Sequence, residues 1–369
     1  MRVAPLLLLL AACSGSGPQT ALEPQGPIGR DIDGVWDLVL ILATFVFVLV
    51  MALLVWAMWR YRERPGDETE PKQIHGSSVI EIGGVVFSVV LLAFISVPTV
   101  RGLLDIRKVP EGDDVLQIQV TGHQWWWEFE YVDEVAADGP TLITANELHI
   151  PEDVSVYLTM TSVDVIHSFW IPALNGKRDV VPGRVTNLTL IADDPTPPGE
   201  PIPGQCAEFC GLAHADMRIK VHVHTAADYA TWVEEQLAPS AQPAAETPLD
   251  AGWQTFSALC TACHQVTLED VEGEVTTHGP ERYVTTDDVE FRSSFGPNLT
   301  HLYSRGTFGS GTFTLDADHL SQWIDNPGSL KPMRADRNDL ANGKVLGMPD
   351  LGLSPTEIEE VVDLLETWR

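Results

Sequence analysis

Two long apolar segments near the N-terminus constrain the fold of this chain more than any other feature. The first runs roughly from Val35 to Trp59 and the second roughly from Val79 to Val100. A helix needs about 20 predominantly apolar residues to cross the hydrocarbon core of a bilayer, and both segments reach that length. The sequence therefore predicts a two-helix transmembrane hairpin over residues 35–108.

The loop between the two segments indicates which way the hairpin faces. It carries Arg60, Arg62, Arg64 and Lys72 close to the ends of the predicted helices. Positive residues in short loops favour the cytoplasmic side of a membrane. Both ends of the chain are therefore expected on the outer, periplasmic side of a bacterial inner membrane.

The N-terminus has the pattern of an export signal. Residues 1–12 hold one arginine and a short apolar run, and the ending Leu-Ala-Ala-Cys resembles a bacterial lipobox. Cleavage would leave Cys13 as a lipidated first residue, followed by a polar tether over residues 13–34. The alternative is an uncleaved leader with an unused cysteine.

Net charge limits the classes of partner. The formal net charge is −30 at neutral pH, which argues against binding to nucleic acid. The excess of acidic residues either attracts basic partners or keeps an exposed surface solvated, and composition does not decide between the two.

Residues 113–237 read as an all-β domain. Short runs rich in β-branched and aromatic residues, such as VLQIQVTGHQWWWEFEYV and SVYLTMTSVDVIHSFW, are separated by Gly, Pro and Asp turns. This spacing predicts an antiparallel sandwich. Trp125, Trp126 and Trp127 are expected on a strand, whereas His222 and His224 are expected to be exposed strand residues.

One loop of this domain gathers soft metal ligands. Cys206, Cys210, His214 and Met217 lie within twelve residues. A disulfide is the bland alternative, but thiolate, imidazole and thioether together favour copper over Mg²⁺ or Ca²⁺. A mononuclear electron-transfer site needs only one cysteine, so the second thiolate suggests two metal ions with bridging sulfurs. His167, at a strand end, is the best candidate for the second imidazole.

These residues resemble subunit II of the haem-copper oxidases. The matching pattern is His167, then Cys206-x-Glu208-x-Cys210-x₃-His214-x₂-Met217, with GHQWWWEFEY, DVIHSFWIP and VPGR as further matches. The resemblance implies a membrane hairpin that carries a cupredoxin-like β-barrel with a dinuclear CuA centre. A copper chaperone of the Sco type lacks the His and Met after the second cysteine and lacks a second span.

Further roles follow from the resemblance alone. The backbone carbonyl of Glu208 would bind one copper, and its side chain would face a Mg²⁺ shared with subunit I. Trp125 would be where the donor docks and electrons enter. Glu81 would open a proton channel shared with subunit I, although it could also simply lie among the lipid headgroups.

Residues 250–369 form a second outer domain behind the Pro/Ala-rich linker 238–249. Cys260-Thr-Ala-Cys263-His264 is the signature of covalent c-type haem attachment, in which His264 binds the iron. The sixth ligand is expected to be Met348 rather than Met333. The segment resembles an all-α class I cytochrome c, except for an acidic insertion over residues 265–291, and its last helix carries a capping box at Ser354.

The sequence thus predicts subunit II of a cytochrome c oxidase with a fused cytochrome c. Electrons would pass from an external donor through its haem to CuA and on to subunit I, where O₂ is reduced and protons are translocated. Subunit I and subunit III are the expected partners, together with the external electron donor. Two alternatives stay open: the equivalent subunit of a CuA-type nitric oxide reductase, and a membrane-anchored copper or electron carrier without a catalytic partner.

Overall fold

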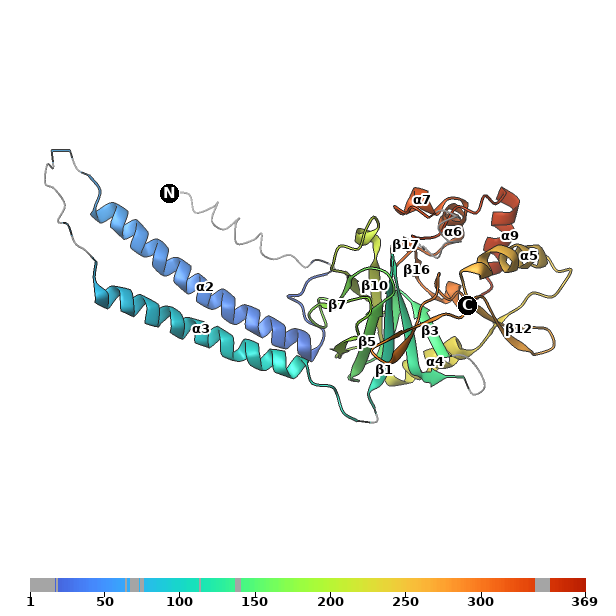
Figure 1. Cartoon of the computed structure of the whole chain (residues 1–369), viewed down its shortest axis with the longest axis horizontal. Coiled ribbons are helices and arrows are strands. Elements are labelled where there is room, and N and C mark those ends of the chain that lie inside the picture. The colour runs from blue at the N-terminus through green and yellow to red at the C-terminus, as the bar shows by residue number, and fades with distance from the viewer. Residues whose placement is uncertain are drawn as a thin grey trace. The chain divides into compact units, whose positions relative to one another are not determined.

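A computed structural model describes residues 17–335 and 346–369, apart from residues 18, 64, 67–72, 74–75, 113 and 137–140 (Figure 1). The expected signal peptide and Cys13 lie outside the described residues, as do Arg64 and Lys72 of the loop. The chain divides into two compact units, residues 30–108 and the remainder.

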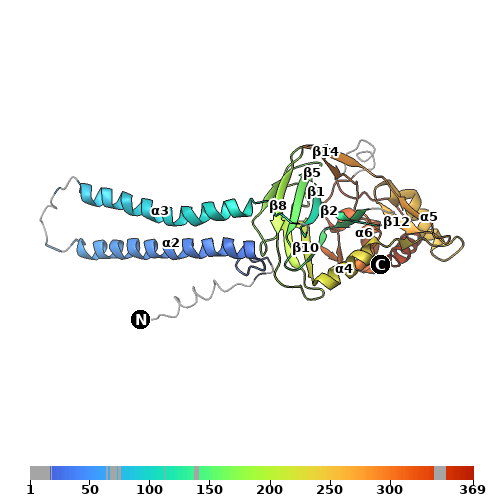
Figure 2. The same cartoon turned by 90° about the horizontal axis from the view of Figure 1, so that it is seen from below.

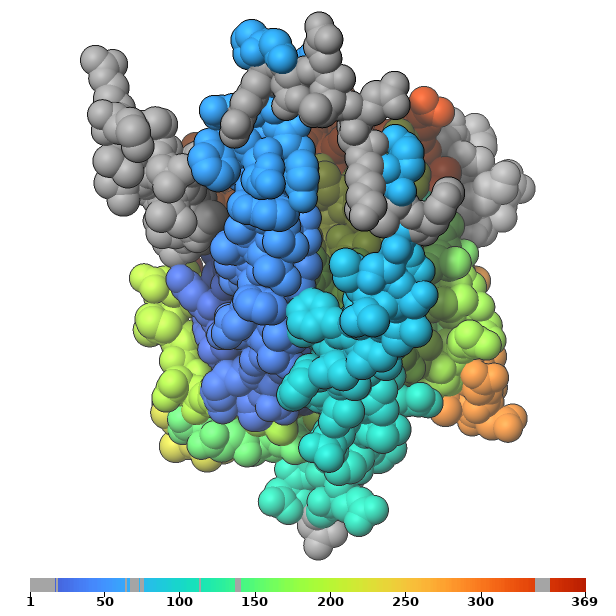
Figure 3. All heavy atoms as spheres, turned by 90° about the vertical axis from the view of Figure 1, so that its left-hand side faces the viewer, coloured from blue at the N-terminus to red at the C-terminus, as the bar shows by residue number. Residues whose placement is uncertain are grey.

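The first unit is a pair of long helices, α2 (Pro27–Arg60) and α3 (Ser78–Ile106). Both are long and apolar enough to cross a membrane. They run side by side (Figures 2 and 3). The rings of Phe45 and Phe87 are in contact, with their centroids 6.4 Å apart. Their outward-facing side chains are largely exposed apolar groups, as expected for surfaces that meet lipid.

The helix α2 begins earlier than expected, because residues 27–34 of the predicted tether are helical. The residues before it are also held in place. The backbone N–H of Gln25 donates to the carbonyl of Ala173, and the carbonyl of Gln25 accepts from the backbone N–H of Asp193. This part of the chain is therefore packed against the β domain. Glu81 lies in the first turn of α3 and is exposed.

The β domain is a sandwich of two five-stranded sheets. One sheet has the order β3-β2-β1-β5-β8 and the other β4-β10-β9-β6-β7. The first is built from β1 (Leu116–His123), β2 (Trp126–Val135), β3 (Thr141–Ala145), β5 (Val156–Ser162) and β8 (Thr186–Leu190). The second is built from β4 (Glu147–Pro151), β6 (His167–Trp170), β7 (Arg178–Val180), β9 (Ile202–Cys206) and β10 (Arg218–His224). The helix α4 (Ala226–Leu237) follows β10.

The cupredoxin-like sandwich agrees with the sequence-based expectation, with one difference in pairing. The sheets are mixed rather than antiparallel, since β1 pairs with β5 and β4 pairs with β10 in parallel. Aromatic side chains join the sheets: Phe169 of β6 contacts Trp127 and Phe129 of β2 edge-on, at centroid distances of 5.3 and 6.3 Å. All three rings are buried, so they fix the ends of the strands that carry the copper-type ligands.

The C-terminal region contradicts the all-α expectation. Its helices are α5 (Asp250–Leu259), α6 (Ala317–Asp325), α7 (Pro327–Leu330) and α9 (Pro355–Leu365), with short 3₁₀ turns at Cys260–Ala262 and Leu302–Ser304. Between and before them lie short strands: β11 (Ser240–Ala241), β12 (Val266–Glu269), β13 (Val275–His278), β14 (Tyr283–Thr286), β15 (Val289–Arg292), β16 (Thr307–Phe308) and β17 (Phe313–Thr314).

The acidic insertion is the main cause of this difference. It forms two hairpins, β12–β13 and β14–β15, in which Val and Thr alternate between short turns. β-branched residues in such runs favour strands. The linker is also ordered, because its Ser240–Ala241 pairs with β12 in parallel.

The helices of this region pack as their sequences predict. Ser354 caps α9 and forms the expected capping box with Glu357. The apolar face of α9 is buried against α5. Gly252 of α5 permits this crossing, since a Cβ there would lie 2.1 Å from the backbone oxygen of Glu360.

Candidate metal centre

The soft ligands predicted from the sequence meet at one end of the sandwich. Strand β6 begins with His167 and β9 ends with Cys206, and the two strands are hydrogen-bonded neighbours, with Phe169 opposite Cys206. The loop after β9 carries Cys210, and the 3₁₀ turn His214–Asp216 leads to Met217. The pairing of β6 with β9 therefore brings together residues about forty positions apart.

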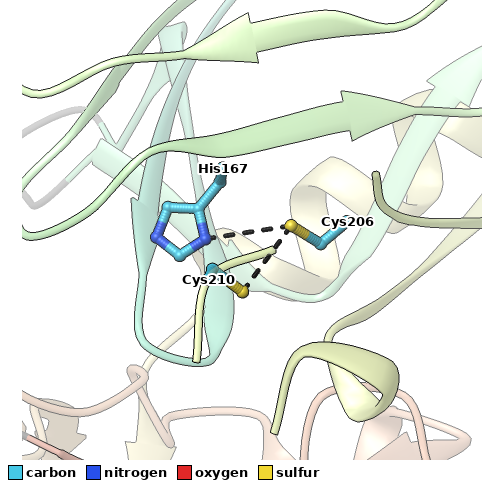
Figure 4. Close-up of side chains that lie close together, drawn as sticks. All are labelled: His167, Cys206 and Cys210. Carbon is cyan, nitrogen blue, oxygen red and sulfur yellow. Dashed lines mark hydrogen bonds between the residues drawn. The ribbon is translucent and has the colours of Figure 1, made fainter. Parts of the chain in front are cut away.

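The donor atoms converge (Figure 4). The two sulfurs of Cys206 and Cys210 are 3.8 Å apart, and Nδ1 of His167 lies 3.9 Å from the Cys206 sulfur. Nδ1 of His214 and the sulfur of Met217 lie 3.6 and 3.9 Å from the Cys210 sulfur. A disulfide has an S–S distance of about 2.05 Å, so the cysteines are free thiols.

This arrangement fits a pair of metal ions better than one. One imidazole lies beside each sulfur, and the thioether of Met217 lies beside Cys210. The backbone carbonyl of Glu208 lies 3.3 Å from the Cys206 sulfur. The soft donor set suits copper. The Glu208 side chain is exposed.

The protonation states also suit metal binding. Nε2 of His167 donates to Asp164 at 2.9 Å, which leaves Nδ1 free to face the sulfurs. Such a carboxylate orients a ligating imidazole. The hydrogen bond from the Cys210 thiol lowers the pKa of Cys206, and the same contact raises that of Cys210. These shifts favour the thiolate form at Cys206 over Cys210.

Trp125 lies next to this centre but is not on a strand. It occupies the turn between β1 and β2 and is only 4 % exposed. Its indole Nε1–H donates to the carbonyl of Cys210 at 2.9 Å. The neighbouring Gln124 side chain donates to the same carbonyl at 2.7 Å. The turn thus supports the backbone of a candidate ligand.

A second group of predicted residues lines a cavity between the C-terminal domain and the β domain. The candidate site residues from the sequence that line it are Cys260, Cys263, His264, Met333, Met348 and Trp125. Most of the other lining residues are apolar, including Phe256, Leu259, Leu299, Leu302, Leu320, Trp323, Ile324 and Val361. Both methionines considered from the sequence therefore reach the same cavity.

The imidazole of His264 is held in one orientation. Its Nδ1 donates to the carbonyl of Pro297 at 2.9 Å, so Nε2 is the atom left to act as a ligand. Gly296 makes this contact possible, because a Cβ there would lie 2.6 Å from the ring. The sulfur of Met348 lies 3.1 Å from the indole Nε1 of Trp323.

Sequence reasoning missed a buried lysine between the two sites. The ammonium of Lys331 donates to the carbonyls of Trp125 and Gly309 at 3.0 and 3.3 Å and to the hydroxyl of Ser310 at 2.7 Å. Ser310 in turn donates to the carbonyl of Trp125. Nothing in the local sequence SLKPMRAD marks this lysine as buried.

Sequence reasoning also misjudged a group of histidines. His222 and His224 were expected to be exposed, but both are partly buried and contact His149. His123 is also buried, and its Nε2 lies 3.1 Å from a carboxylate oxygen of the buried Glu128. The register of β4 with β10, which places these histidines side by side, has no local sequence signal.

Comparisons with known proteins agree with this site. Residues 19–101 match the family "Cytochrome C oxidase subunit II, transmembrane domain", and residues 116–224 match "Cytochrome C oxidase subunit II, periplasmic domain". The second match includes every candidate ligand of the copper-type centre, and this family implies a CuA copper site.

Full-length relatives are also similar. Cytochrome c oxidase subunit 2 of Alkalihalophilus pseudofirmus is 34% identical over 331 residues, which cover 88% of this chain and 87% of the relative. That of Bacillus subtilis is 30% identical over 341 residues, with the same coverage. Quinol oxidase subunit 2 of Bacillus cereus is 32% identical over 245 residues, covering 63% of this chain and 78% of the relative.

The two apolar helices, the cupredoxin-like sandwich and the converging ligands all agree with these matches. The chain is a membrane protein with a periplasmic domain, and its relatives are subunits of haem-copper oxidases, which implies a subunit I. It belongs to the cytochrome c oxidase subunit II family.

Proposed function

We propose that this chain is the electron-accepting subunit of a cytochrome c oxidase with its own c-type haem. Electrons from an external donor would reach a haem held by Cys260, Cys263, His264 and Met348, pass to a dinuclear CuA centre and continue to subunit I. There O₂ would be reduced to water, coupled to proton translocation.

The single observation that carries this proposal is that Trp125 belongs to both sites. Its indole donates to the carbonyl of Cys210, and the same residue lines the cavity that contains the CxxCH motif. Lys331 and Ser310 of the C-terminal domain bind its carbonyl. One residue therefore spans the space between the two redox sites.

The cavity residues fit a covalently bound haem. Cys260 and Cys263 are free thiols, and burial raises the pKa of Cys260 to about 12. His264 presents Nε2, because Pro297 takes its other N–H. When bound, the haem and copper ions would supply one-electron redox chemistry; Met ligation raises the potential of a His-ligated haem.

The burial of Trp125 changes where an external donor would dock. Elements of the C-terminal domain cover it, so a separate donor protein cannot touch its ring. We expect the donor to bind the C-terminal domain instead. Trp125 would then serve the intramolecular step rather than the docking step.

Two of the cytochrome c oxidase relatives align beyond the copper-type domain, which supports the proposal of a cytochrome c oxidase with a shared C-terminal domain. Only 249 residues precede Asp250, so relatives that cover 88% of the chain must align with much of the C-terminal domain. The quinol oxidase alignment covers 63%, which the first 249 residues can accommodate. A c-type haem would accept single electrons from a protein donor.

Surface residues support contact with further subunits. Phe209, beside the candidate copper ligands, is 77% exposed, and the Glu208 carboxylate is exposed next to it. We propose that this loop faces subunit I and that Glu208 shares a Mg²⁺ with it. Glu81 would open a proton channel there, subunit III would complete the complex, and Cys13 would carry a lipid anchor.

The test follows electrons within one molecule. The full chain, purified in detergent with copper and haem, is photoreduced by less than one electron per molecule. Haem and copper absorbance are then followed. Electron transfer should be first order, with a rate independent of protein concentration, and Trp125→Phe should slow it because the indole N–H to Cys210 is lost.

Trp126→Phe is the matched control. Trp126 follows Trp125 as the first residue of β2 and stacks on His123 at 4.1 Å. It should leave the transfer rate unchanged. Equal rates in both variants would remove Trp125 from the path, and a concentration-dependent rate or no haem at CxxCH would contradict the proposed function itself.

A further inference from the structure

A cluster of potential metal ligands lies on the outer face of the second sheet, apart from the copper-type centre. Glu147 and His149 belong to β4, and His222 and His224 belong to β10. The parallel register places His222 opposite His149. Alternate residues of a strand point to the same face, so all four side chains lie on the face opposite the sandwich core.

Two of the imidazoles are joined edge to edge. Nδ1 of His149 lies 2.8 Å from Nε2 of His224, and their rings are within 15° of coplanar. One nitrogen must therefore donate a proton to the lone pair of the other. His149 also stacks on Trp232 of α4 at 4.2 Å and on His222 at 4.5 Å, which fixes the plane of its ring.

The third imidazole has an unsatisfied nitrogen. Within the described part of the chain, Nε2 of His222 is buried and has no hydrogen-bond partner. A carboxylate oxygen of Glu147, which is buried, lies 3.5 Å away. Buried polar atoms without a partner are uncommon and call for an explanation, such as a bound ion. Ligand atoms of Glu147, His149 and His222 all lie within 4.8 Å of one another.

The pKa shifts of Glu147, His149 and His224 favour the forms that bind a metal. Burial alone would raise the pKa of Glu147, but the nearby His222 imidazole and a hydrogen bond from Thr307 lower it overall. Burial lowers the pKa of His149 well below its usual value, and it also lowers that of His224. Neutral imidazoles and an ionised carboxylate are the forms that coordinate metal ions.

We propose that Glu147, His149 and His222 bind a divalent transition metal ion of the Zn²⁺ type, with His224 as the hydrogen-bond partner that orients His149. Imidazole and carboxylate together are a common ligand set for this class of ion. Donors of a tetrahedral zinc site lie roughly 3.4 Å apart, given bonds of about 2.1 Å. The ligand atoms of the cluster lie within 4.8 Å of one another, so binding an ion would require a small movement of these side chains.

The site would also join two parts of the chain. Glu147 accepts hydrogen bonds from the backbone N–H and the hydroxyl of Thr307, at 2.9 and 2.5 Å. Thr307 belongs to β16 of the C-terminal domain. An ion on Glu147 would therefore be linked to the contact that holds this domain on the sandwich, and its binding should raise the unfolding temperature of the chain.

The test measures zinc binding to the full chain, purified in detergent with a histidine-free tag and loaded with copper and haem. Equilibrium dialysis against micromolar ZnCl₂, followed by elemental analysis, should show one zinc ion per chain. Loss of an outer-shell partner already weakens metal binding by roughly tenfold or more. Glu147→Gln and His222→Ala should therefore each weaken zinc binding by at least about tenfold. Co²⁺ should give the visible absorption of a tetrahedral site.

His319→Ala is the control. His319 is an exposed histidine of α6, outside the cluster, and lies 2.7 Å from Asp316 at the start of that helix. It should bind zinc as the parent chain does. His224→Gln replaces any variant that loses its copper absorption. The proposal is overturned if the copper- and haem-loaded parent chain binds no zinc, or if the cluster variants bind zinc with unchanged affinity.

Discussion

Replacing Lys331 by Met tests whether this buried lysine destabilises the contact that it bridges. Lys331 is 3% exposed and donates to Trp125, Gly309 and Ser310. Burial lowers its pKa from 10.5 to about 7, against the opposing attraction of Asp216. Met has a similar length and no charge, so it removes the ammonium while filling most of the space.

The magnitude follows from two opposing contributions. One pKa unit corresponds to about 1.36 kcal/mol, so the unfavourable burial of the ammonium amounts to about 4 kcal/mol at pH 7. Losing the hydrogen bonds costs about 1–3 kcal/mol, chiefly through the carbonyl of Gly309. We therefore expect Lys331→Met to stabilise the chain by about 1–3 kcal/mol at pH 7.

The pH dependence gives the sharper test. Because the folded pKa lies below the unfolded value, the unfolded chain binds more protons between pH 7 and 10.5, and parent stability rises with pH across this range. At pH 10 the unfavourable contribution falls to about 1 kcal/mol, and the benefit of Met should disappear. Urea unfolding in detergent at both pH values measures this. A variant that is equally destabilised at pH 7 and pH 10 would refute the reasoning.

Three further predictions concern other parts of the chain. Gly252→Ala should lower the free energy of unfolding by about 1–3 kcal/mol, because its Cβ would meet the backbone oxygen of Glu360 at 2.1 Å; a gain in stability, as for an unhindered helix, would contradict this. His149, with its pKa lowered, should make stability fall as pH drops below 6.5, by up to about 1.36 kcal/mol per pH unit; His149→Gln should flatten that slope in acid unfolding curves. Met348→Ala should lower the haem potential in redox titration whereas Met333→Ala should not, and the reverse result would exchange the two ligands.

Features whose residues all lie within one short segment could be predicted from the sequence. The capping box at Ser354 lies within a few residues, so its helix could be recognised directly. Cys206 to Met217 form one loop, and their chemistry is visible in their spacing. His167 could be assigned because a soft ligand set that lacked one imidazole required it.

Features that depend on long-range pairing could not be predicted. The cluster around His149 exists because β4 pairs with β10, strands that lie about seventy residues apart. Trp125 was placed on a strand because its aromatic neighbours continue into β2, but the turn begins before it. The burial of Lys331 depends on the docking of the C-terminal domain on that turn.

The acidic insertion shows a different limit. Its strands have four residues each, and charged residues between them hide the alternation of Val and Thr. What stabilises it is a tertiary contact: the buried Arg292 lies 3.3 Å from both Glu130 of β2 and Glu281. The acidic composition of this segment therefore gave no indication of its strands.

The most direct test of the central claim is electron paramagnetic resonance of the full chain loaded with copper. His167, Cys206, Cys210, His214 and Met217 surround a space in which two ions can share the two sulfurs. We predict two copper ions per chain and hyperfine structure from one unpaired electron shared equally by two copper nuclei. One copper ion per chain, with the hyperfine structure of a single nucleus, would contradict the account.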